Sequence, residues 1–234
     1  MNKIIDYRFM LFFLFLHGVN VYAENVDAYE LIYEESEAGT DSYKVKYTVT
    51  ERYLRIDQLG DQSGYIIYDN DEHTVQSVVH NDQSILLIPR YDYRMPDLSR
   101  LVNIEYFIIP DAPKIATRPI YNFRATSSDS SSELCLDIKL AEGLLPDVSH
   151  LLSNYQEILV GQQSRLLSAT PDEYRSNCFL YDQIYNKGDY YRKGLPVQER
   201  HSNGKKRLLV SYKKVRVDSV IFQVEKSYKK YSLD

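Results

Sequence analysis

Short apolar runs separated by polar turn residues fill residues 43–90, and this pattern constrains the fold more than any other part of the chain. Within residues 43–50 every second residue is apolar, which is typical of a strand with one buried face. Further short apolar runs follow at residues 52–58, 65–68, 74–80 and 84–88. Turn-forming Gly, Asn and Asp residues separate these runs. We therefore predict a meander of antiparallel strands.

Two of these runs, residues 65–68 and 85–88, are apolar at consecutive positions and cannot hide both faces against a single layer. Either protein covers the sheet on both sides, or one face lines a cavity. A cavity in a curved sheet would hold an apolar ligand without any catalytic group. The residues that we expect to line such a ligand site are Tyr47, Val49, Leu54, Ile56, Ile67, Val79 and Leu87.

Residues 147–167 carry the clearest helical pattern, with apolar side chains at three- and four-residue spacing. Pro146 precedes the pattern, and Asp147 is suited to cap the helix. This helix can cover one face of the sheet, and a shorter helix is expected within residues 172–184. Nothing in the sequence is clearly assigned to the other face.

Further strands are expected after the long helix, one beginning at Gly194 and others at residues 207–212 and 217–224. The sequence shows no internal repeat and no linker long enough to separate domains. We therefore predict a single α+β domain over residues 24–234, built from an antiparallel sheet and a few helices.

Residues 1–23 have the pattern of a cleaved secretory signal peptide. Lys3 and Arg8 give a basic start, an unbroken apolar run follows at residues 9–16, and Ala23 stands at the predicted cleavage position. The alternative is an uncleaved membrane anchor, but a spanning helix needs roughly 20 apolar residues. Glu24 rather than Cys follows the cleavage position, so no N-terminal lipid is expected. These features predict a soluble protein exported to the periplasm.

Cys135 and Cys178 are the two cysteines of the chain. In an exported protein such a pair usually forms a disulfide. The two residues lack the short spacing of zinc ligands, and neither belongs to a Cys-x-x-Cys motif. We therefore predict a structural disulfide rather than a metal site or a catalytic thiol.

No motif in the sequence points to catalysis, a metal or a cofactor. The histidines form no His-x-His or His-Glu-x-x-His pair, and we expect His73 and His80 to be solvated. The chain also lacks the Gly-x-Ser-x-Gly elbow of serine hydrolases and the glycine-rich motifs of nucleotide-binding proteins. The acidic turn at residues 69–72 does not match the spacing of a calcium loop. We predict a protein that is not an enzyme and that needs neither metal nor cofactor.

The formal net charge of −5 disfavours nucleic acid as a partner, because binding to phosphates needs a basic surface. Basic residues nevertheless gather late in the chain, at residues 205–207, 213–216 and 229–230. These clusters are either solvated strand edges or a docking patch for an anionic lipid or an acidic partner.

Several segments share an order that is characteristic of one superfamily. They are the strands at 53–57, 64–69, 73–79 and 84–88, Cys135 before a long helix, the Gly-Leu-Pro strand at 194–196 and the final strand at 218–224. Together they resemble the LolA-like periplasmic proteins over most of residues 24–234. The Pro-x-Gly-Tyr ending of that superfamily is absent, and residues 225–228 stand in its place.

This resemblance implies a strongly curved antiparallel half-barrel, with one long and one or two short helices packed on its concave face. Members of the superfamily bind acyl chains or partner proteins there. Its lipoprotein carriers use an inward-pointing Arg to control a helical lid. Arg52 and Arg55 are the candidates for that part here, with no specific match to either.

Two hypotheses of function follow. The first is a monomeric carrier that binds a lipid or an acylated protein in the concavity of the sheet. The second is an interaction or sensor module that uses the same fold to bind an envelope protein, with the late basic clusters as its contact surface. An open apolar interior would favour the carrier, and a filled interior would favour the module.

Overall fold

The apolar rhythm of residues 43–90 becomes five consecutive strands in the computed structural model, which describes residues 24–233. Each strand pairs with the next through an antiparallel ladder, so the predicted meander is confirmed. The predicted signal peptide at residues 1–23 lies outside the described residues. The strands are β2 (Tyr43–Val49), β3 (Tyr53–Gln58), β4 (Gly64–Asp69), β5 (Thr74–Val79) and β6 (Ser84–Pro89).

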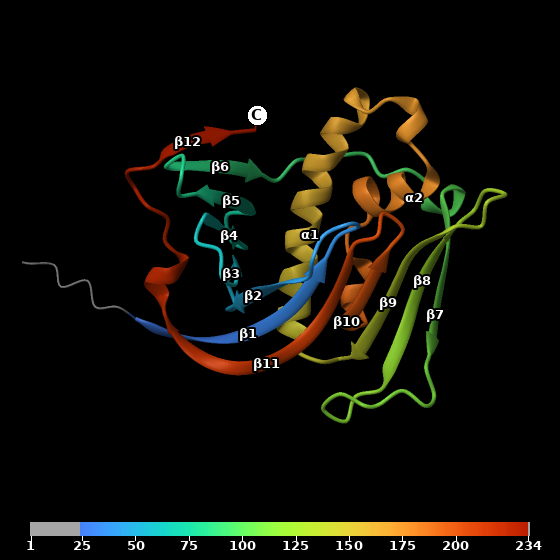
Figure 1. Cartoon of the computed structure of the whole chain (residues 1–234), viewed down its shortest axis with the longest axis horizontal. Helices are drawn as coiled ribbons and strands as arrows, with labels where there is room; N and C mark the ends of the chain where they lie inside the picture. Colours follow the sequence, from blue (N-terminus) through green and yellow to red (C-terminus); the bar gives the residue numbers. More distant parts are fainter. Residues whose placement is uncertain (1–23, 234) are drawn as a thin grey trace, which may run out of the picture.

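The meander is one arm of a larger sheet of twelve strands, whose order is β12-β6-β5-β4-β3-β2-β1-β11-β10-β9-β8-β7. Two long curved strands, β1 and β11, cross the middle of the molecule, and the second arm rises beyond them (Figure 1). All neighbours are antiparallel except β12 and β6. The remaining strands are β1 (Asn25–Ser36), β7 (Val102–Ile108), β8 (Ile120–Ser127), β9 (Leu134–Glu142), β10 (Gly194–His201), β11 (Lys206–Asp218) and β12 (Lys229–Ser232).

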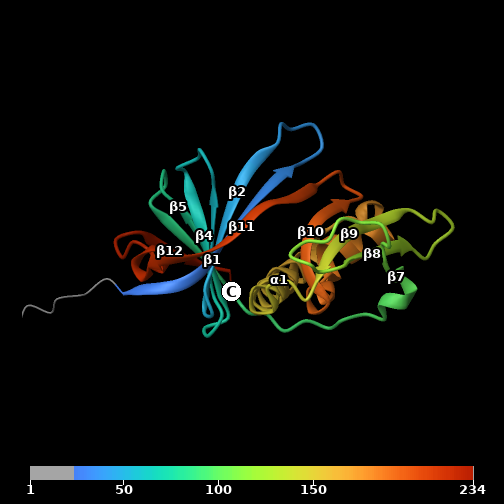
Figure 2. The same ribbon diagram turned by 90° about the horizontal axis from the view of Figure 1, so that it is seen from below.

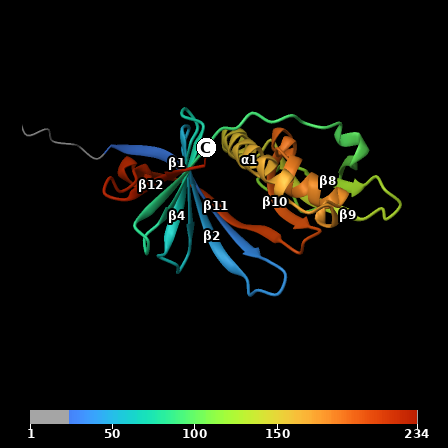
Figure 3. The same ribbon diagram turned by 90° about the horizontal axis from the view of Figure 1, so that it is seen from above.

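The long helix α1 (Pro146–Leu166) lies between the two arms, as the views from below and above show (Figures 2 and 3). Its N-cap is Leu145, in the left-handed region at φ 47°, so the prediction that Asp147 caps the helix is wrong. Pro146 fits the first helical position because its missing N–H needs no partner there. Gly161 lets a loop cross the helix closely, because a Cβ at this position would lie 2.7 Å from the carbonyl oxygen of Tyr91.

The other helical segments are short, and the single helix expected within residues 172–184 is broken into pieces. They are η1 (Leu98–Arg100), η2 (Leu167–Ala169), η3 (Asp172–Tyr174), α2 (Asn177–Phe179), η4 (Leu180–Tyr185), η5 (Asp189–Arg192) and η6 (Ser219–Phe222). The strand expected at residues 217–224 is also wrong beyond Asp218, where β11 ends and η6 begins. Asp218 stops the strand by capping η6, since its carboxylate accepts a hydrogen bond from the Val220 N–H at 2.9 Å.

The inner face of the sheet packs on α1 and forms the main core. Four apolar residues of the predicted helical stripe are at most 2 % exposed: Val148, Leu151, Leu152 and Ile158. They pack in one cluster with inward residues of both arms, such as Leu54 of β3 and Ile138 of β9. The α+β half-barrel with a long helix in its concavity, which the resemblance implied, is therefore what the structure shows.

The segment after β11 covers the outer face of the meander, for which the sequence had offered no cover. The ring of Phe222 in η6 stacks on Tyr53 at 5.2 Å, and the Arg55 guanidinium donates to the carbonyl of Ile221 at 2.6 Å. Farther along, the Tyr228 hydroxyl lies 2.9 Å from Nδ1 of His80. The meander strands are thus covered by protein on both sides, which accounts for their two-sided apolar pattern.

Candidate functional site

Most of the residues predicted to line a ligand site lie on the inner face of the meander: Tyr47, Val49, Leu54, Ile56 and Val79. Leu54 pairs with Tyr68, whose ring lies 5.8 Å from that of Tyr155 in α1. Tyr47, Val49 and Leu54 are each at most 6 % exposed. In this structure they pack beneath α1 as part of the core.

Ile67 and Leu87, which were also predicted to line the site, lie on the opposite face of the meander. Both pair with Gln76 of β5, so both point outward. Ile67 is fully buried there, on the face that the segment after β11 covers. The structure therefore divides the predicted residues between two faces and does not bring them into one site.

Three adjoining hollows surround the first turns of α1. The first, the sheet-side hollow, has a volume of about 690 Å³ and lies between α1 and the strands β1 and β2. Tyr29 and Val49 line it from the sheet, and Val148 and Leu151 line it from the helix. Val49 is thus a predicted ligand-site residue that does reach a hollow.

The other two hollows continue around the helix. The loop-side hollow, of about 270 Å³, shares Tyr29 and Val148 with the sheet-side hollow and includes Arg118. The η5-side hollow, of about 320 Å³, lies between α1 and η5 and is lined on its polar side by Lys187 and Lys193. His150 lines both the sheet-side and the η5-side hollows, so these two meet at its side chain.

The sheet-side hollow has an apolar floor and a polar rim. Asp27, Glu51, Asp147 and Lys214 stand around the rim. The Lys214 ammonium lies 2.8 Å from the Asp27 carboxylate, an exposed pair that stabilises the strand ends little. This arrangement suits a ligand with an apolar body that enters from solvent.

A cluster of charged and tyrosine side chains lies inside the sheet, where the two arms meet. The buried Arg207 guanidinium of β11 pairs with the Glu199 carboxylate of β10, with Nε 3.1 Å from Oε1. The guanidinium also donates to the hydroxyls of Tyr47 and Tyr191, at 3.1 and 3.0 Å. The Tyr47 hydroxyl in turn donates to the Glu35 carboxylate at 3.4 Å. Arg207, and not Arg52 or Arg55, is therefore an arginine that points inward.

His201 extends this cluster on the other side of Glu199. Its Nδ1 lies 2.8 Å from Asp182 Oδ1, and its Nε2 lies 3.5 Å from Glu199 Oε2. Burial alone would lower the pKa of His201, but the two carboxylates outweigh it and raise the pKa to about 9. Burial alone would raise the pKa of Glu199, but Arg207 and His201 lower it to about 2. Both groups are charged at neutral pH.

Arg52 and Arg55, the arginines expected to point inward, lie elsewhere. The Arg52 guanidinium pairs with Asp69 at 2.7 Å, at the turn that follows β4. The Arg55 guanidinium pairs with Asp57 at 2.8 Å on the outer face and holds the segment after β11. Neither arginine contacts α1 through these pairs. The structure therefore does not support the role that the resemblance implied for them, which is control of a helical lid.

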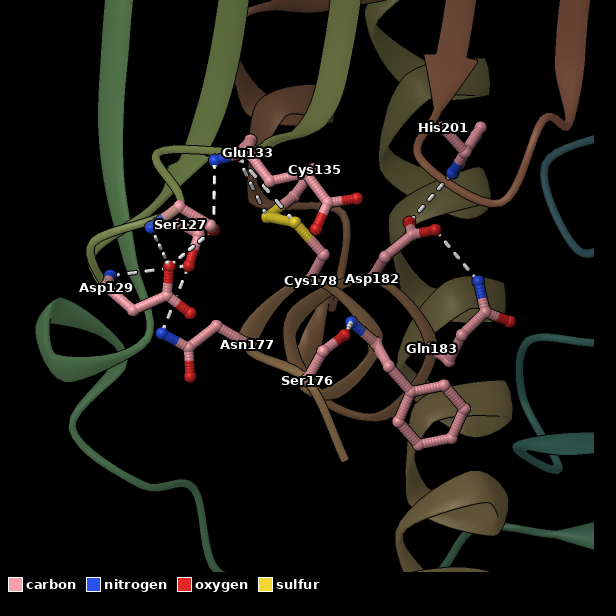
Figure 4. The surroundings of a disulfide bond; sticks show 12 residues. Ser127, Asp129, Glu133, Cys135, Ser176, Asn177, Cys178, Asp182, Gln183 and His201 are labelled. Atoms are coloured by element: carbon pink, nitrogen blue, oxygen red, sulfur yellow. Dashed lines mark hydrogen bonds and ion pairs between the residues drawn. A yellow bond between two sulfur atoms is a disulfide. The ribbon is translucent and has the colours of Figure 1, made fainter. Parts of the chain in front are cut away.

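The predicted disulfide between Cys135 and Cys178 is confirmed, with the two Cα atoms 4.7 Å apart (Figure 4). It joins β9 to the short helix α2. The Asn177 amide donates to the Ser127 hydroxyl at 3.1 Å and adds a second link to the same arm. The disulfide thus fixes the start of the segment that carries Asp182 into the cluster.

Four of the eight basic residues in the late clusters form ion pairs within the protein: Arg207, Lys213, Lys214 and Arg216. Arg207 is buried, as described above. Lys213 pairs with Glu30 at 2.9 Å, and Lys214 pairs with Asp27. These pairs leave less free positive charge on β11 than the sequence suggested.

Within residues 24–233, no group of three or more His, Cys, Asp or Glu side chains is placed to hold a metal ion. No helix in this same range is long and apolar enough to cross a membrane.

No protein-family model matches the sequence, and no curated protein matches it. A comparison with solved structures finds similar chains at low identity. An uncharacterized conserved protein from Thermus thermophilus is 7 % identical, with a TM-score of 0.45 over 88 % of this chain and 90 % of that one. PNGF-II is 9 % identical, with a TM-score of 0.43 over 89 % of this chain, which spans 31 % of PNGF-II. A LolA superfamily protein from Nitrosomonas europaea is 7 % identical, with a TM-score of 0.31 over 87 % of this chain and 91 % of that one.

Proposed function

We propose that the protein is an exported, LolA-like, non-enzymatic carrier that binds the apolar part of a lipid or acylated protein beside the start of α1. The observation that carries this proposal is the sheet-side hollow, where the apolar inner face meets solvent. Its volume of about 690 Å³ lies within the range of roughly 300–1,000 Å³ that is usual for small-molecule sites.

The contacts between α1 and the meander support entry of a ligand at this place. They include a hydrogen bond from the Asn154 amide to Asn70 at 2.9 Å and an exposed ion pair between Glu157 and Arg90 at 3.4 Å. Each is worth little, because exposed pairs contribute about 0–1 kcal/mol and a typical hydrogen bond about 1 kcal/mol. These weak polar contacts, and not the packed core beneath α1, are what a ligand beside the helix would displace.

The largely buried His201 is not placed to act as the general base for a hydroxyl nucleophile. In a serine hydrolase the histidine Nε2 accepts a proton from a nucleophilic hydroxyl. Here Nε2 faces the Glu199 carboxylate at 3.5 Å, and the ring is held between two carboxylates. The disulfide, which is typical of oxidising compartments, supports export.

Replacing His150 by Trp tests the proposal, because this exposed residue lies at the joint of two hollows. The variant should weaken binding of a fluorescent fatty acid, measured by titration and by native mass spectrometry of the complex. Gln163→Trp is the matched control, since it places the same bulk on an exposed position of α1 outside the hollows described above. Equal binding by both variants, or no binding by the wild-type chain, would refute the carrier.

A second candidate function, binding of an envelope protein, is favoured by β7. This strand is at an edge of the sheet, and its Ile104, Phe107 and Ile108 are 42–51 % exposed. Such an edge can accept a strand from a partner. Crosslinking in cells should then give one dominant protein adduct that Ile104→Lys removes, and a fatty-acid titration should be unaffected by that variant.

A further inference from the structure

We propose that the η5-side hollow is a head-group subsite that binds the phosphate of an anionic lipid whose acyl chain occupies the sheet-side hollow. This inference rests on the proposed function and adds to it the chemical class of the ligand. Two observations carry it: the hollows adjoin at His150, and the η5-side hollow holds two lysines that have no ion-pair partner among residues 24–233.

The hollows are neighbours because they share lining residues. His150 belongs to both hollows, and the loop-side hollow joins them through Pro146 on one side and Val148 on the other. A ligand that passes the exposed His150 side chain would therefore lie partly in each hollow. An amphiphile is the class of molecule that matches an apolar and a polar compartment in succession.

The charges of the η5-side hollow do not cancel. Arg192 pairs with Asp189 at 3.4 Å, and Glu157 pairs with Arg90, also at 3.4 Å. These pairs use both acidic residues that line the hollow. Lys187 and Lys193 remain, and they make the hollow locally positive.

Both lysines can reach a ligand. Lys193 is exposed and Lys187 is half-buried. The Lys193 ammonium lies 5.4 Å from the centre of the Tyr106 ring. This contact positions the ammonium group and leaves its positive charge unpaired. A lysine ammonium is a mobile point charge that binds phosphate oxygens well. Both positive charges would therefore attract a phosphate that enters the hollow.

The test compares a lysophosphatidylglycerol with a monoacylglycerol of the same chain length, each titrated by calorimetry below its critical micelle concentration. The wild-type chain should bind the anionic lipid about tenfold more tightly at low salt, and the preference should shrink as salt rises. Lys187→Glu with Lys193→Glu should abolish the preference, so that the anionic lipid binds no more tightly than the monoacylglycerol. The matched control is Lys226→Glu with Lys230→Glu, the same charge change at exposed positions that line none of the three hollows.

The outcomes separate this inference from the function on which it rests. Equal affinity for the two lipids, or an unchanged preference in the Lys187 and Lys193 variant, would overturn the head-group subsite while leaving the carrier intact. Failure of both lipids to bind would overturn the carrier and the subsite together. Glycerophosphoglycerol, the head group without a chain, should bind far more weakly than the lipid. Equal affinity for it would show a site for free phosphate esters instead.

Discussion

Glu199 of β10 lies directly opposite Arg207 of β11, at the centre of the three-pair ladder that joins the two arms of the sheet. Along the rest of β11, which continues to pair with β1, no residue pair with β10 is formed within the described chain. The two side chains are 5 % and 11 % exposed. A buried ion pair therefore stands at the narrowest connection between the arms.

We expect Glu199→Leu to lower the free energy of unfolding by about 3–5 kcal/mol, because Arg207 would keep a buried charge without its carboxylate. Arg207→Met should cost a similar amount by leaving Glu199 unpaired. The double variant should be more stable than either single variant, since apolar pairs often replace buried ion pairs without loss. Urea unfolding followed by circular dichroism measures all of them. Strictly additive losses would show that the pair does not act as a unit.

The pH dependence of stability should have a plateau between about pH 4.5 and 6.5, the ordinary pKa values of Glu and His. The pKa of Glu199 is lowered to about 2, so its contribution is complete above pH 4.5 and is lost as the pH falls toward 2. The pKa of His201 is raised to about 9, so its contribution is complete below pH 6.5 and is lost as the pH rises toward 9. Thermal melts across this range measure the profile.

The loss of stability above pH 6.5 is the part of the profile that depends on His201. His201→Gln should be less stable than wild type at pH 6, and the difference should shrink by pH 9.5, because the wild-type imidazole is then neutral as well. His73→Gln is the control, since His73 is exposed at a turn. Parallel profiles for the His201 variant and wild type would contradict the assignment.

The local sequence pattern was enough to predict those elements that pair with their neighbours along the chain. The meander, the long helix and the disulfide follow from period-two alternation, helical spacing and cysteine count, and each is confirmed. The cluster around Arg207 was missed, and Arg207 was assigned to a surface patch. Its partner Tyr47 is 160 positions away, and only the register of β2, β1, β11 and β10 brings these side chains together. One signal was present: in β11, Arg207 alternates in phase with Leu209, which faces inward.

The covered outer face was missed for a related reason. We predicted one strand over residues 217–224, but β11 ends at Asp218. The Asp218 side chain caps the short helix η6, so the strand does not continue. The segment that follows binds the meander through backbone carbonyls and rings, and no local sequence period marks such contacts. The structure therefore leaves the hollows beside α1, and not the whole concave face, as the candidate ligand site.

Loss of the disulfide should destabilise the protein by about 2–4 kcal/mol, because Cys135 and Cys178 close a loop of sequence separation 43. The variant in which both cysteines are replaced by Ala should melt at a lower temperature than wild type under non-reducing conditions. In reducing buffer the two proteins should melt together. Peptide mapping without reductant should recover the linked peptide, and two free thiols in protein purified from the periplasm would contradict the prediction.

Phe222 should be the anchor that keeps the segment after β11 on the outer face of the meander. The residue is 6 % exposed and stacks on Tyr53, so Phe222→Ala should lower the free energy of unfolding by about 3–5 kcal/mol. Val220→Ala, in the same short helix but 52 % exposed, should change it by less than about 0.5 kcal/mol. Hydrogen exchange should show faster exchange in β12 of the Phe222 variant, because β12 follows this segment in the chain and pairs with the edge strand β6. Unchanged exchange there, with a loss of stability elsewhere, would place the anchor at Arg55 and its 2.6 Å bond to the Ile221 carbonyl instead.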